Sequence, residues 1–265
     1  MGSIEAPWGS GSGASLPLEF PDDWRVGPGS VVQPDLAGGV ADYPAALEQA
    51  LDAPLDAPRL EELVRAGSKV ALVVDDPSRW TPVREALPIV LRRLHAAGVA
   101  DRDVTISVGV GRHHAVGAEA MRRRLGDDAA ARYVCHSPPV DDLSAYDDLG
   151  VTSQGVPIRV FRPVAQADVR ILIGSVLPHL QAGFGGGYKL IFPGTSHRTT
   201  LGALHRQGLS AGGDAGRLLG GCASGNPMRQ AIHEAARRLG PCVSISHLIG
   251  SPGMIFRVLS GRPES

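Results

Sequence analysis

The chain carries two lysines against twenty-four arginines, and one of these lysines ends its most glycine-dense stretch. That stretch reads Ala-Gly-Phe-Gly-Gly-Gly-Tyr-Lys over residues 182–189. In a sequence so biased towards arginine, a lysine at such a place indicates that a primary amine is needed. An amine can act as a nucleophile or become an amide nitrogen, whereas a guanidinium stays protonated. Lys189 is therefore a candidate functional residue, and chance survival is the alternative.

Histidines after two apolar segments are candidates for proton transfer. His113 and His114 follow Gly109-Val-Gly111, and His179 follows Leu177-Pro178. Histidine titrates near neutral pH, so each could act as a general acid or base. Two histidines on opposite sides of a ligand could move a proton on either face. The alternative is that the His113–His114 pair is simply solvated.

Three further polar residues could bind a ligand or a metal. Arg79 could hold a carboxylate through two hydrogen bonds, and Asp76 could orient a histidine. The alternative is a local surface ion pair, which contributes little to stability. His205 lies on an expected helix and could ligate a metal, although no second ligand stands at a metal-binding spacing. A packed or solvated histidine is the alternative there.

The glycine loop at residues 183–187 could let backbone amides approach an anion, because missing side chains permit close contact. It does not match the phosphate-binding loop of nucleotide hydrolases, since the final Gly-Lys-Ser/Thr is absent. It does not match the dinucleotide-binding fingerprint either. A flexible turn is the alternative.

Composition excludes several classes of function. The formal net charge is -1 and no basic run is present, which argues against nucleic acid. No apolar stretch is long enough to cross a membrane, and the first residues do not resemble a signal peptide. The three cysteines, Cys135, Cys222 and Cys242, are widely separated and odd in number, so no disulfide framework is expected. We expect a cytoplasmic protein.

Apolar runs and helical periodicity alternate along the chain. Strands are expected at 69–75, 104–110, 132–135, 158–161 and 169–173, with further apolar segments at 242–249 and 254–259. Helices are expected near 43–52, 82–98, 117–125, 197–206 and 226–239. This alternation predicts an α/β fold, with a mostly parallel Rossmann-like sheet covered by helices on both faces. We expect residues 1–60 to form an extended, loop-rich segment packing on the α/β catalytic domain of residues 61–265.

The polar candidates fall where such a sheet binds ligands. Ligand sites in open α/β sheets lie beyond the carboxyl ends of the strands. Residues 75–79, 109–114 and 174–189 each follow an expected buried strand. Their convergence at one edge predicts a single site.

Four of these motifs together resemble the lactate racemase family, which uses a nickel-pincer nucleotide. The segment at 173–194, IGSVLPHLQAGFGGGYKLIFPG, is similar to the family's hallmark. Asp76-Pro-Ser-Arg-Trp-Thr-Pro82 resembles its D-x-[ST]-R-x-x-P loop, and Gly111-Arg-His113 resembles its G-x-H motif. His179 and His205 stand ten residues before and sixteen residues after Lys189, as in the family. The resemblance covers most of residues 60–260.

The resemblance implies an isomerase, a racemase or epimerase of a 2-hydroxy acid that works by hydride transfer. The implied cofactor is pyridinium-3,5-bisthiocarboxylic acid mononucleotide carrying nickel. Implied partners are a small 2-hydroxy acid and the enzymes that build the cofactor and insert nickel. The implied roles are a covalent cofactor anchor at Lys189, a nickel ligand at His205, acid/base groups at His113 and His179, a carboxylate holder at Arg79, support for His113 from Asp76, and cofactor contacts at Gly185, Gly186 and Gly187.

The sequence departs from the family pattern in three places. Gly185 stands where the family has serine, and Trp80 stands where proline is common. The sequence also stops about where the family's second domain would begin, so that C-terminal domain is expected to be absent. Two other readings stay open. One is a nickel-free enzyme that binds an anion or nucleotide on the same scaffold, and the other is an inactive truncated homologue.

Overall fold

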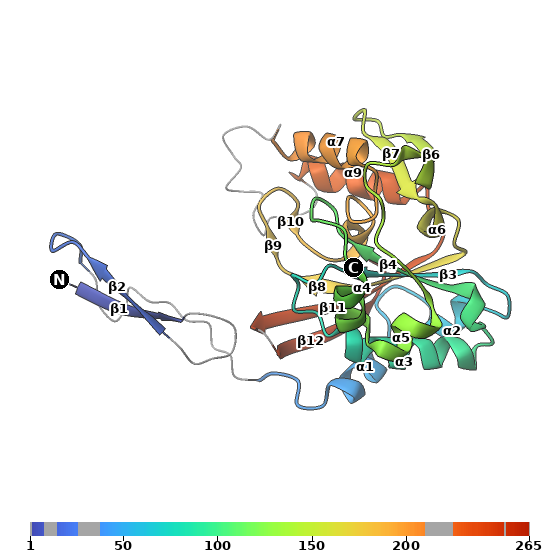
Figure 1. The fold of residues 1–265 in the computed structure, drawn as a ribbon, viewed down its shortest axis with the longest axis horizontal. Coiled ribbons are helices and arrows are strands. Elements are labelled where there is room, and N and C mark those ends of the chain that lie inside the picture. Colours follow the sequence, from blue (N-terminus) through green and yellow to red (C-terminus); the bar gives the residue numbers. More distant parts are fainter. Residues whose placement is uncertain (1, 8–14, 26–37, 210–224, 252, 265) are drawn as a thin grey trace.

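A six-stranded sheet forms the centre of the molecule (Figure 1). The structure, a computed structural model, describes residues 2–7, 15–25, 38–209, 225–251 and 253–264. The strand order is β12-β11-β8-β3-β4-β5, and only β12 runs antiparallel to its neighbour. The strands are β3 (Val70–Asp75), β4 (Val104–Gly109), β5 (Val134–His136), β8 (Val169–Val176), β11 (Cys242–Ser251) and β12 (Met254–Gly261). The predicted α/β class with a mostly parallel sheet is confirmed.

The order of the strands places a topological switch point between β3 and β8. The chain runs outward from β3 to β4 and β5, then returns to add β8 and β11 on the other side of β3. All five of these strands are parallel, so their carboxyl ends share one edge. Loops that leave neighbouring strands in opposite directions open a crevice at such a point, where α/β proteins bind ligands.

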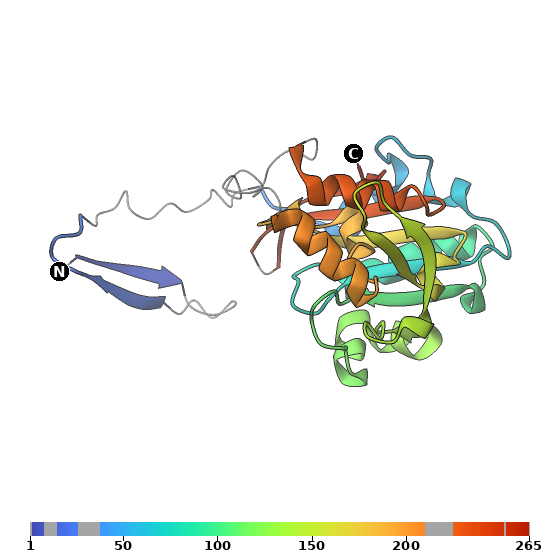
Figure 2. The same cartoon turned by 90° about the horizontal axis from the view of Figure 1, so that it is seen from above.

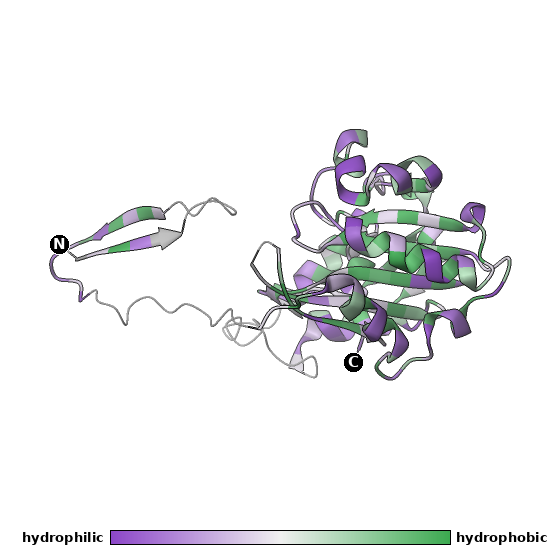
Figure 3. Ribbon diagram, turned by 90° about the horizontal axis from the view of Figure 1, so that it is seen from below, coloured by the Kyte–Doolittle hydropathy of each residue, from purple (hydrophilic) through white to green (hydrophobic). Residues whose placement is uncertain are grey.

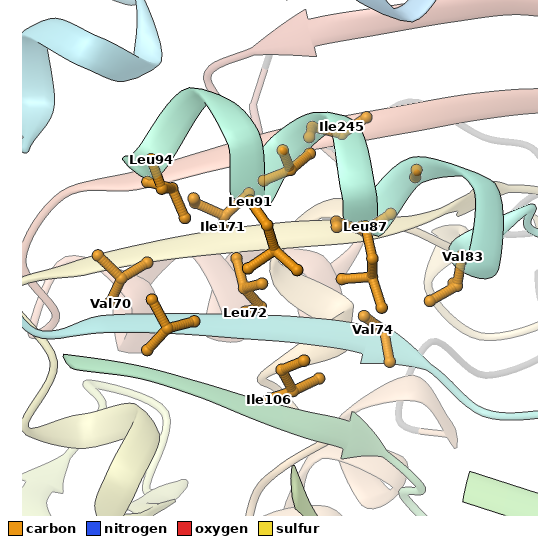
Figure 4. Packing of buried hydrophobic residues seen from close by; sticks show 14 of the residues in the cluster. Val70, Leu72, Val74, Val83, Leu87, Leu91, Leu94, Ile106, Ile171 and Ile245 are labelled. Atoms are coloured by element: carbon orange, nitrogen blue, oxygen red, sulfur yellow. The ribbon is translucent and has the colours of Figure 1, made fainter. Parts of the chain in front are cut away.

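One face of the sheet is covered by helices from the first half of the chain. They are α1 (Tyr43–Asp52), α2 (Leu60–Leu63), α3 (Val83–Ala96), α4 (Ala118–Leu125) and α5 (Asp127–Arg132). In α3, Val83, Leu87, Leu91 and Leu94 recur at helical spacing and pack on the inner strands (Figure 4). This stripe explains why the segment is helical despite Pro88 inside it.

The opposite face carries elements from the second half of the chain. Here lie α6 (Arg162–Ala165), the short 3-10 helix η4 (Gly187–Leu190), α7 (Arg198–Leu209), α9 (Pro227–Ala236) and the hairpin of β6 (Tyr146–Val151) and β7 (Pro157–Phe161). Ala71, Val73 and Leu172 point into this second core. Figure 2 shows these elements from above. Apolar residues concentrate in the central strands, as Figure 3 shows. The prediction of helices on both faces is confirmed.

The strand predicted at residues 158–161 is confirmed as β7, which pairs with β6 in a separate two-stranded sheet. One boundary prediction needs correction. The strand expected to begin at residue 132 begins at Val134, because α5 continues to Arg132. Two short strands, β9 (Pro178–His179) and β10 (Gly183–Phe184), pair with each other beyond the end of β8.

The first residues form elements of their own. β1 (Gly2–Pro7) and β2 (Ser15–Phe20) make an antiparallel hairpin. Further along, α1 is attached to β11 by a 2.9 Å hydrogen bond between the Tyr43 hydroxyl and Nε2 of His247. The domain division at residue 60 stays a prediction.

Two other sequence expectations meet the structure here. No helix in the described ranges is long and apolar enough to cross a membrane. Cys135 and Cys242 are free thiols, and Cys222 lies outside the described residues.

Candidate active site

A cavity of about 230 Å³ opens at the carboxyl ends of β3, β4 and β8. We call it the switch-point cavity. Its walls include eight of the nine predicted site residues: Asp76, Arg79, His113, His179, Gly185, Gly186, Lys189 and His205. Gly187 lines a neighbouring cavity of about 300 Å³, which shares Gly185 and Gly186 with the first. His114 lines neither of these two cavities. The structure thus gathers residues that lie up to 129 positions apart, as from Asp76 to His205.

The loop after β3 is fixed by a partly buried arginine from α4. Arg124 forms an ion pair with the buried carboxylate of Asp75. Its guanidinium also donates to the carbonyl oxygens of Asp75, Arg79 and Thr81, at 3.2, 3.0 and 3.0 Å. Asp75 in turn accepts from the Thr81 hydroxyl at 2.5 Å and from the Ser175 backbone N–H at 3.2 Å. The contacts of Arg124 and Asp75 therefore fix the loop that carries Asp76 and Arg79.

Asp76 and His113 form a pair across two loops. Oδ1 of Asp76 lies 3.1 Å from Nδ1 of His113 and accepts the Ser78 backbone N–H at 2.9 Å. Burial raises the pKa of Asp76, but the hydrogen bonds from Ser78 and the nearby His113 prevail and hold it below its usual range. An ionised Asp76 accepts a hydrogen bond from the Nδ1–H of His113, which leaves the other ring nitrogen, Nε2, free to take a proton from a ligand.

Arg79 lies beside the same carboxylate without a close pairing. Its Nε is 3.9 Å from Oδ2 of Asp76, and its side chain is 44% exposed. The guanidinium is therefore available to hold an anion at the cavity wall.

Glycines bring the loop after β4 against the segment that follows Lys189. The Gly111 backbone N–H donates to the Gly194 carbonyl at 2.9 Å, and the Gly194 N–H donates to the Lys189 carbonyl at 3.1 Å. A Cβ at Gly109 would come within 2.9 Å of the Leu190 carbonyl oxygen, and one at Gly194 within 2.1 Å. A side chain at Gly109 would push the end of β4 away from the segment after Lys189, and a side chain at Gly194 would distort that segment itself.

Lys189 lies on η4, where its amine lines the cavity. Burial lowers the pKa of Lys189 to about 7, and the positive charges of Arg229 and Arg79 add to this effect. At pH 7, about half of the molecules then carry Lys189 as the neutral amine. A neutral amine is the nucleophilic form of lysine.

The imidazole of His179 is fixed by its own loop. Its Nδ1 lies 3.2 Å from the Gln181 N–H and 3.1 Å from the Ala182 N–H, and accepts from both. Burial lowers the pKa of His179 to about 4, with further lowering from the charges of Lys189 and His205. The ring is therefore neutral near pH 7, with its proton on Nε2.

His205 lines the cavity from α7. Burial lowers its pKa, and the neighbouring charges of Arg112 and Lys189 lower it further. A neutral imidazole is the form that ligates metals. In the described part of the chain, no group of three His, Cys, Asp or Glu side chains is placed to hold a metal ion.

Arg229 of α9 and the N-cap residue Asn226 hold the glycine loop, and no sequence motif indicates either of them. The Arg229 guanidinium donates to the carbonyls of Ala182 and Phe184, and the Asn226 amide donates to the Gln181 carbonyl. Like Arg124, Arg229 belongs to no motif, because its acceptors are backbone atoms 45 and 47 positions away. The only signal available is a general one, the strong preference of the chain for arginine.

Comparison with known proteins agrees with this arrangement. A family model described as the lactate racemase N-terminal domain matches residues 12–215. A lactate racemase of Lactiplantibacillus plantarum is 30% identical over 159 residues, which are 60% of this chain and 37% of that protein. A lactate racemase of Thermoanaerobacterium thermosaccharolyticum is 23% identical over 272 residues, which are 100% of this chain and 60% of that protein. The chain thus spans well under two thirds of the length of both racemases.

Solved structures agree on the fold. The lactate racemase apoprotein from Thermoanaerobacterium thermosaccharolyticum superposes with a TM-score of 0.80 at 22% identity, covering 99% of this chain and 60% of that one. A Thermotoga maritima protein superposes with a TM-score of 0.64 at 19% identity, covering 76% of this chain and 51% of that one. Since the family model matches more than half of the residues, the chain belongs to the lactate racemase N-terminal domain family.

Proposed function

We propose that this chain takes part in racemising or epimerising a 2-hydroxy acid, with a nickel-pincer nucleotide joined to Lys189. The observation that carries the proposal is the content of the switch-point cavity. It holds an amine with a lowered pKa, two histidines, an arginine and a further neutral histidine on four different segments. The class of reaction is suggested by the relatives of this chain that are named lactate racemase.

The residues present fit the proposed cofactor. Lys189 offers a nucleophilic amine, which covalent attachment needs. Gly185 and Gly186 line the cavity without side chains, which leaves the space that a ring and its substituents need. His205 offers a neutral imidazole nitrogen, which would ligate the nickel of the bound cofactor.

Substrate binding falls to the positive side chain at the cavity wall. Arg79 would hold the carboxylate of the hydroxy acid through paired hydrogen bonds. This contact fixes the α-carbon relative to the two histidines. When bound, the nickel-pincer nucleotide supplies a reversible acceptor for the α-hydride.

His113 is the better prepared of the two proton carriers. Asp76 holds its Nδ1 proton and stabilises the ring when Nε2 takes the substrate's hydroxyl proton. His179 would exchange the proton on the opposite face of the planar 2-keto acid. To accept at Nε2, its own proton must move to Nδ1, so the contacts with the Gln181 and Ala182 N–H groups must open.

A chirality assay tests the proposal. The chain is produced together with cofactor-building and nickel-inserting enzymes, and single enantiomers of several 2-hydroxy acids are followed by chiral chromatography. We expect one acid to approach the racemate, or the epimer mixture, and we expect His113→Ala and His179→Ala to abolish this while keeping the cofactor. Fully loaded protein that interconverts none of the acids would refute the proposed activity for this chain.

A further inference from the structure

The first turn of α9 is attached to the loop that precedes Lys189. Nε and Nη2 of Arg229 donate to the Ala182 carbonyl at 3.1 and 2.9 Å, and Nη2 also donates to the Phe184 carbonyl. Nδ2 of Asn226 donates to the Gln181 carbonyl at 2.9 Å. Three carbonyl groups within four residues of the loop are therefore held by one helical turn.

This turn is itself rigidly built. Asn226 is the N-cap of α9, and its Oδ1 accepts the Arg229 backbone N–H at 3.0 Å. Asn226 is 1% exposed and Arg229 is 8% exposed. In the described residues the acceptors of the Arg229 guanidinium are backbone carbonyls, so no carboxylate neutralises its charge there. The buried cation thus acts on the cavity as well as on the loop.

The loop passes this constraint on to Lys189 through short backbone links. The Gly185 N–H donates to the Leu177 carbonyl at 2.7 Å, and the Lys189 N–H donates to the Gly186 carbonyl at 3.1 Å. Between them, Gly186 sits with φ of 75° and ψ of -175°, a conformation that essentially only glycine adopts. Few backbone torsions therefore remain free between the carbonyls that Arg229 holds and the amine.

We propose that Arg229 is the positioning residue for Lys189: its forked contacts fix the loop at Ala182–Phe184, and its buried guanidinium places a positive charge near the amine. The inference deepens the proposed function and rests on the anchoring role assigned there to Lys189. The proposed role needs no contact between Arg229 and the substrate or cofactor. Arg229 acts through the loop that leads to Lys189.

The charges around the amine support the electrostatic half of the proposal. Arg79, Arg229, His179 and His205 surround Lys189, and Asp75 and Asp76 also line the switch-point cavity. After burial, Arg229 is the largest cause that lowers the pKa of Lys189, ahead of Arg79. Both acids already have cationic or hydrogen-bonding partners, namely Arg124 for Asp75 and His113 for Asp76.

The composition of the chain makes a direct test simple. Lys69 and Lys189 are the only lysines, so labelling by N-hydroxysuccinimidyl acetate can be assigned to each by peptide mass. Lys69 is an internal reference, because its side chain is 61% exposed and pairs with Asp103. The full cofactor-free chain is labelled briefly across a pH series, and hydrogen exchange of the loop amides is measured alongside.

Three variants separate charge from geometry. Arg229→Met removes both, whereas Arg229→Lys keeps the charge but loses the fork. The matched control is Arg170→Met, because Arg170 is also a buried arginine that donates to three carbonyls, those of Val164, Ala165 and Ala167, away from the cavity.

In Arg229→Met we expect the labelling midpoint of Lys189 to rise by about one pH unit, which slows its labelling at pH 7 about fivefold. In Arg229→Lys we expect a smaller shift of the midpoint. Amides of residues 182–189 should exchange about tenfold faster in both variants than in the control, since their opening no longer breaks the fork.

Two results would overturn the proposal. One is loop exchange in Arg229→Lys no faster than in Arg170→Met. The other is a Lys189 midpoint unchanged in a folded Arg229→Met protein. If Arg229→Met does not fold, the loop exchange of Arg229→Lys decides alone. Because both measurements use cofactor-free protein, a chain that lacks racemase activity would still give the predicted results, and the two failures stay distinguishable.

Discussion

In the cavity, burial favours the neutral forms of the Lys189 amine and the His179 ring, while the nearby arginines stay charged. Burial lowers the pKa of Lys189 to about 7 and that of His179 to about 4. Arg79 and Arg229 remain cations beside them. The cavity thus combines neutral, reactive nitrogens with fixed positive charge, an arrangement suited to an anionic substrate or cofactor.

The pairing of Asp76 with His113 predicts a specific loss on mutation. Asp76→Asn keeps the shape of the side chain but removes the charge that holds the Nδ1 proton and stabilises protonated His113. We expect turnover of loaded protein to fall about a hundredfold, within the range of general-base contributions, with little change in cofactor content. Steady-state kinetics check this, with Ser144→Ala as a control outside the cavity. Near-normal turnover would remove Asp76 from the mechanism.

The contacts of His179 predict its tautomer in cofactor-free protein. Because Nδ1 accepts two backbone N–H groups, the proton must lie on Nε2, and the lowered pKa of about 4 keeps the ring neutral from pH 5 to 8. Nitrogen-detected NMR of the histidine rings should show this tautomer with no titration in that range. A His179 signal that titrates near pH 6.5 would contradict the structure.

At the scale of elements, the site depends on loops whose positions follow from the sheet. Sequence periodicity predicted β3, β4 and β8 because their residues are apolar on both faces, and motifs placed after them could be assigned to one edge. The β6 strand was missed because Tyr146-Asp-Asp-Leu-Gly-Val151 has no sustained apolar alternation. Arg124 and Arg229 were missed because they bind carbonyls, which leave no trace in residue type.

Two adjacent glycines of the loop, Gly185 and Gly186, should differ in how much a substitution destabilises the protein. A Cβ at Gly186 would come within 3.0 Å of the Ser175 carbonyl oxygen, and its positive φ disfavours other residues. At Gly185 a Cβ meets only ordinary contacts at 3.5 Å. Gly186→Ala should therefore lower the free energy of unfolding by about 1–3 kcal/mol, measured by urea denaturation.

Gly185→Ser provides the matched comparison, since serine is the residue expected there from the family resemblance. It should change the free energy of unfolding by less than about 0.5 kcal/mol, because a Cβ at this position makes only ordinary van der Waals contacts. Equal destabilisation by the two substitutions would show that the loop is not held as described.

At the scale of the whole molecule, a buried histidine links the first helix to the sheet and makes stability depend on pH. His247 is 0% exposed, donates from Nδ1 to the Gly174 carbonyl and accepts the Tyr43 hydroxyl at Nε2. Its folded pKa is lowered to about 4, mainly by burial. Below pH 6.5 the unfolded chain gains a proton that the folded chain does not take up, so stability falls from pH 6.5 to about 4.

Replacing this histidine should flatten that fall. His247→Gln cannot titrate, and we expect its stability curve to be shallower by up to about 1.4 kcal/mol per pH unit in this window. Urea denaturation at several pH values measures the difference, with the exposed His114→Gln as a control. Parallel curves for wild type and His247→Gln would contradict the assignment.

The sequence was sufficient for the α/β class and the mostly parallel sheet, because the inner strands are apolar on both faces. The strand order that creates the switch point was not predicted, because long connections separate β5 from β8 and β8 from β11. Eight of the nine candidate site residues predicted from the sequence line the switch-point cavity. They could be predicted because each follows a buried strand or stands at a fixed spacing from Lys189. What the sequence could not supply is the protonation state of Lys189 and His179. Those states depend on burial and on cations from α9 and the loop after β3.

The central claim is that Lys189 is the covalent anchor of a nickel-pincer nucleotide. Intact mass spectrometry on chain produced with the cofactor-building and nickel-inserting enzymes tests it most directly. We predict an added mass that peptide mapping places on Lys189, and its complete absence in Lys189→Arg, which keeps the charge but has no nucleophilic amine. An unmodified wild-type chain under conditions that load a full-length racemase, or an adduct that persists in Lys189→Arg, would contradict the account.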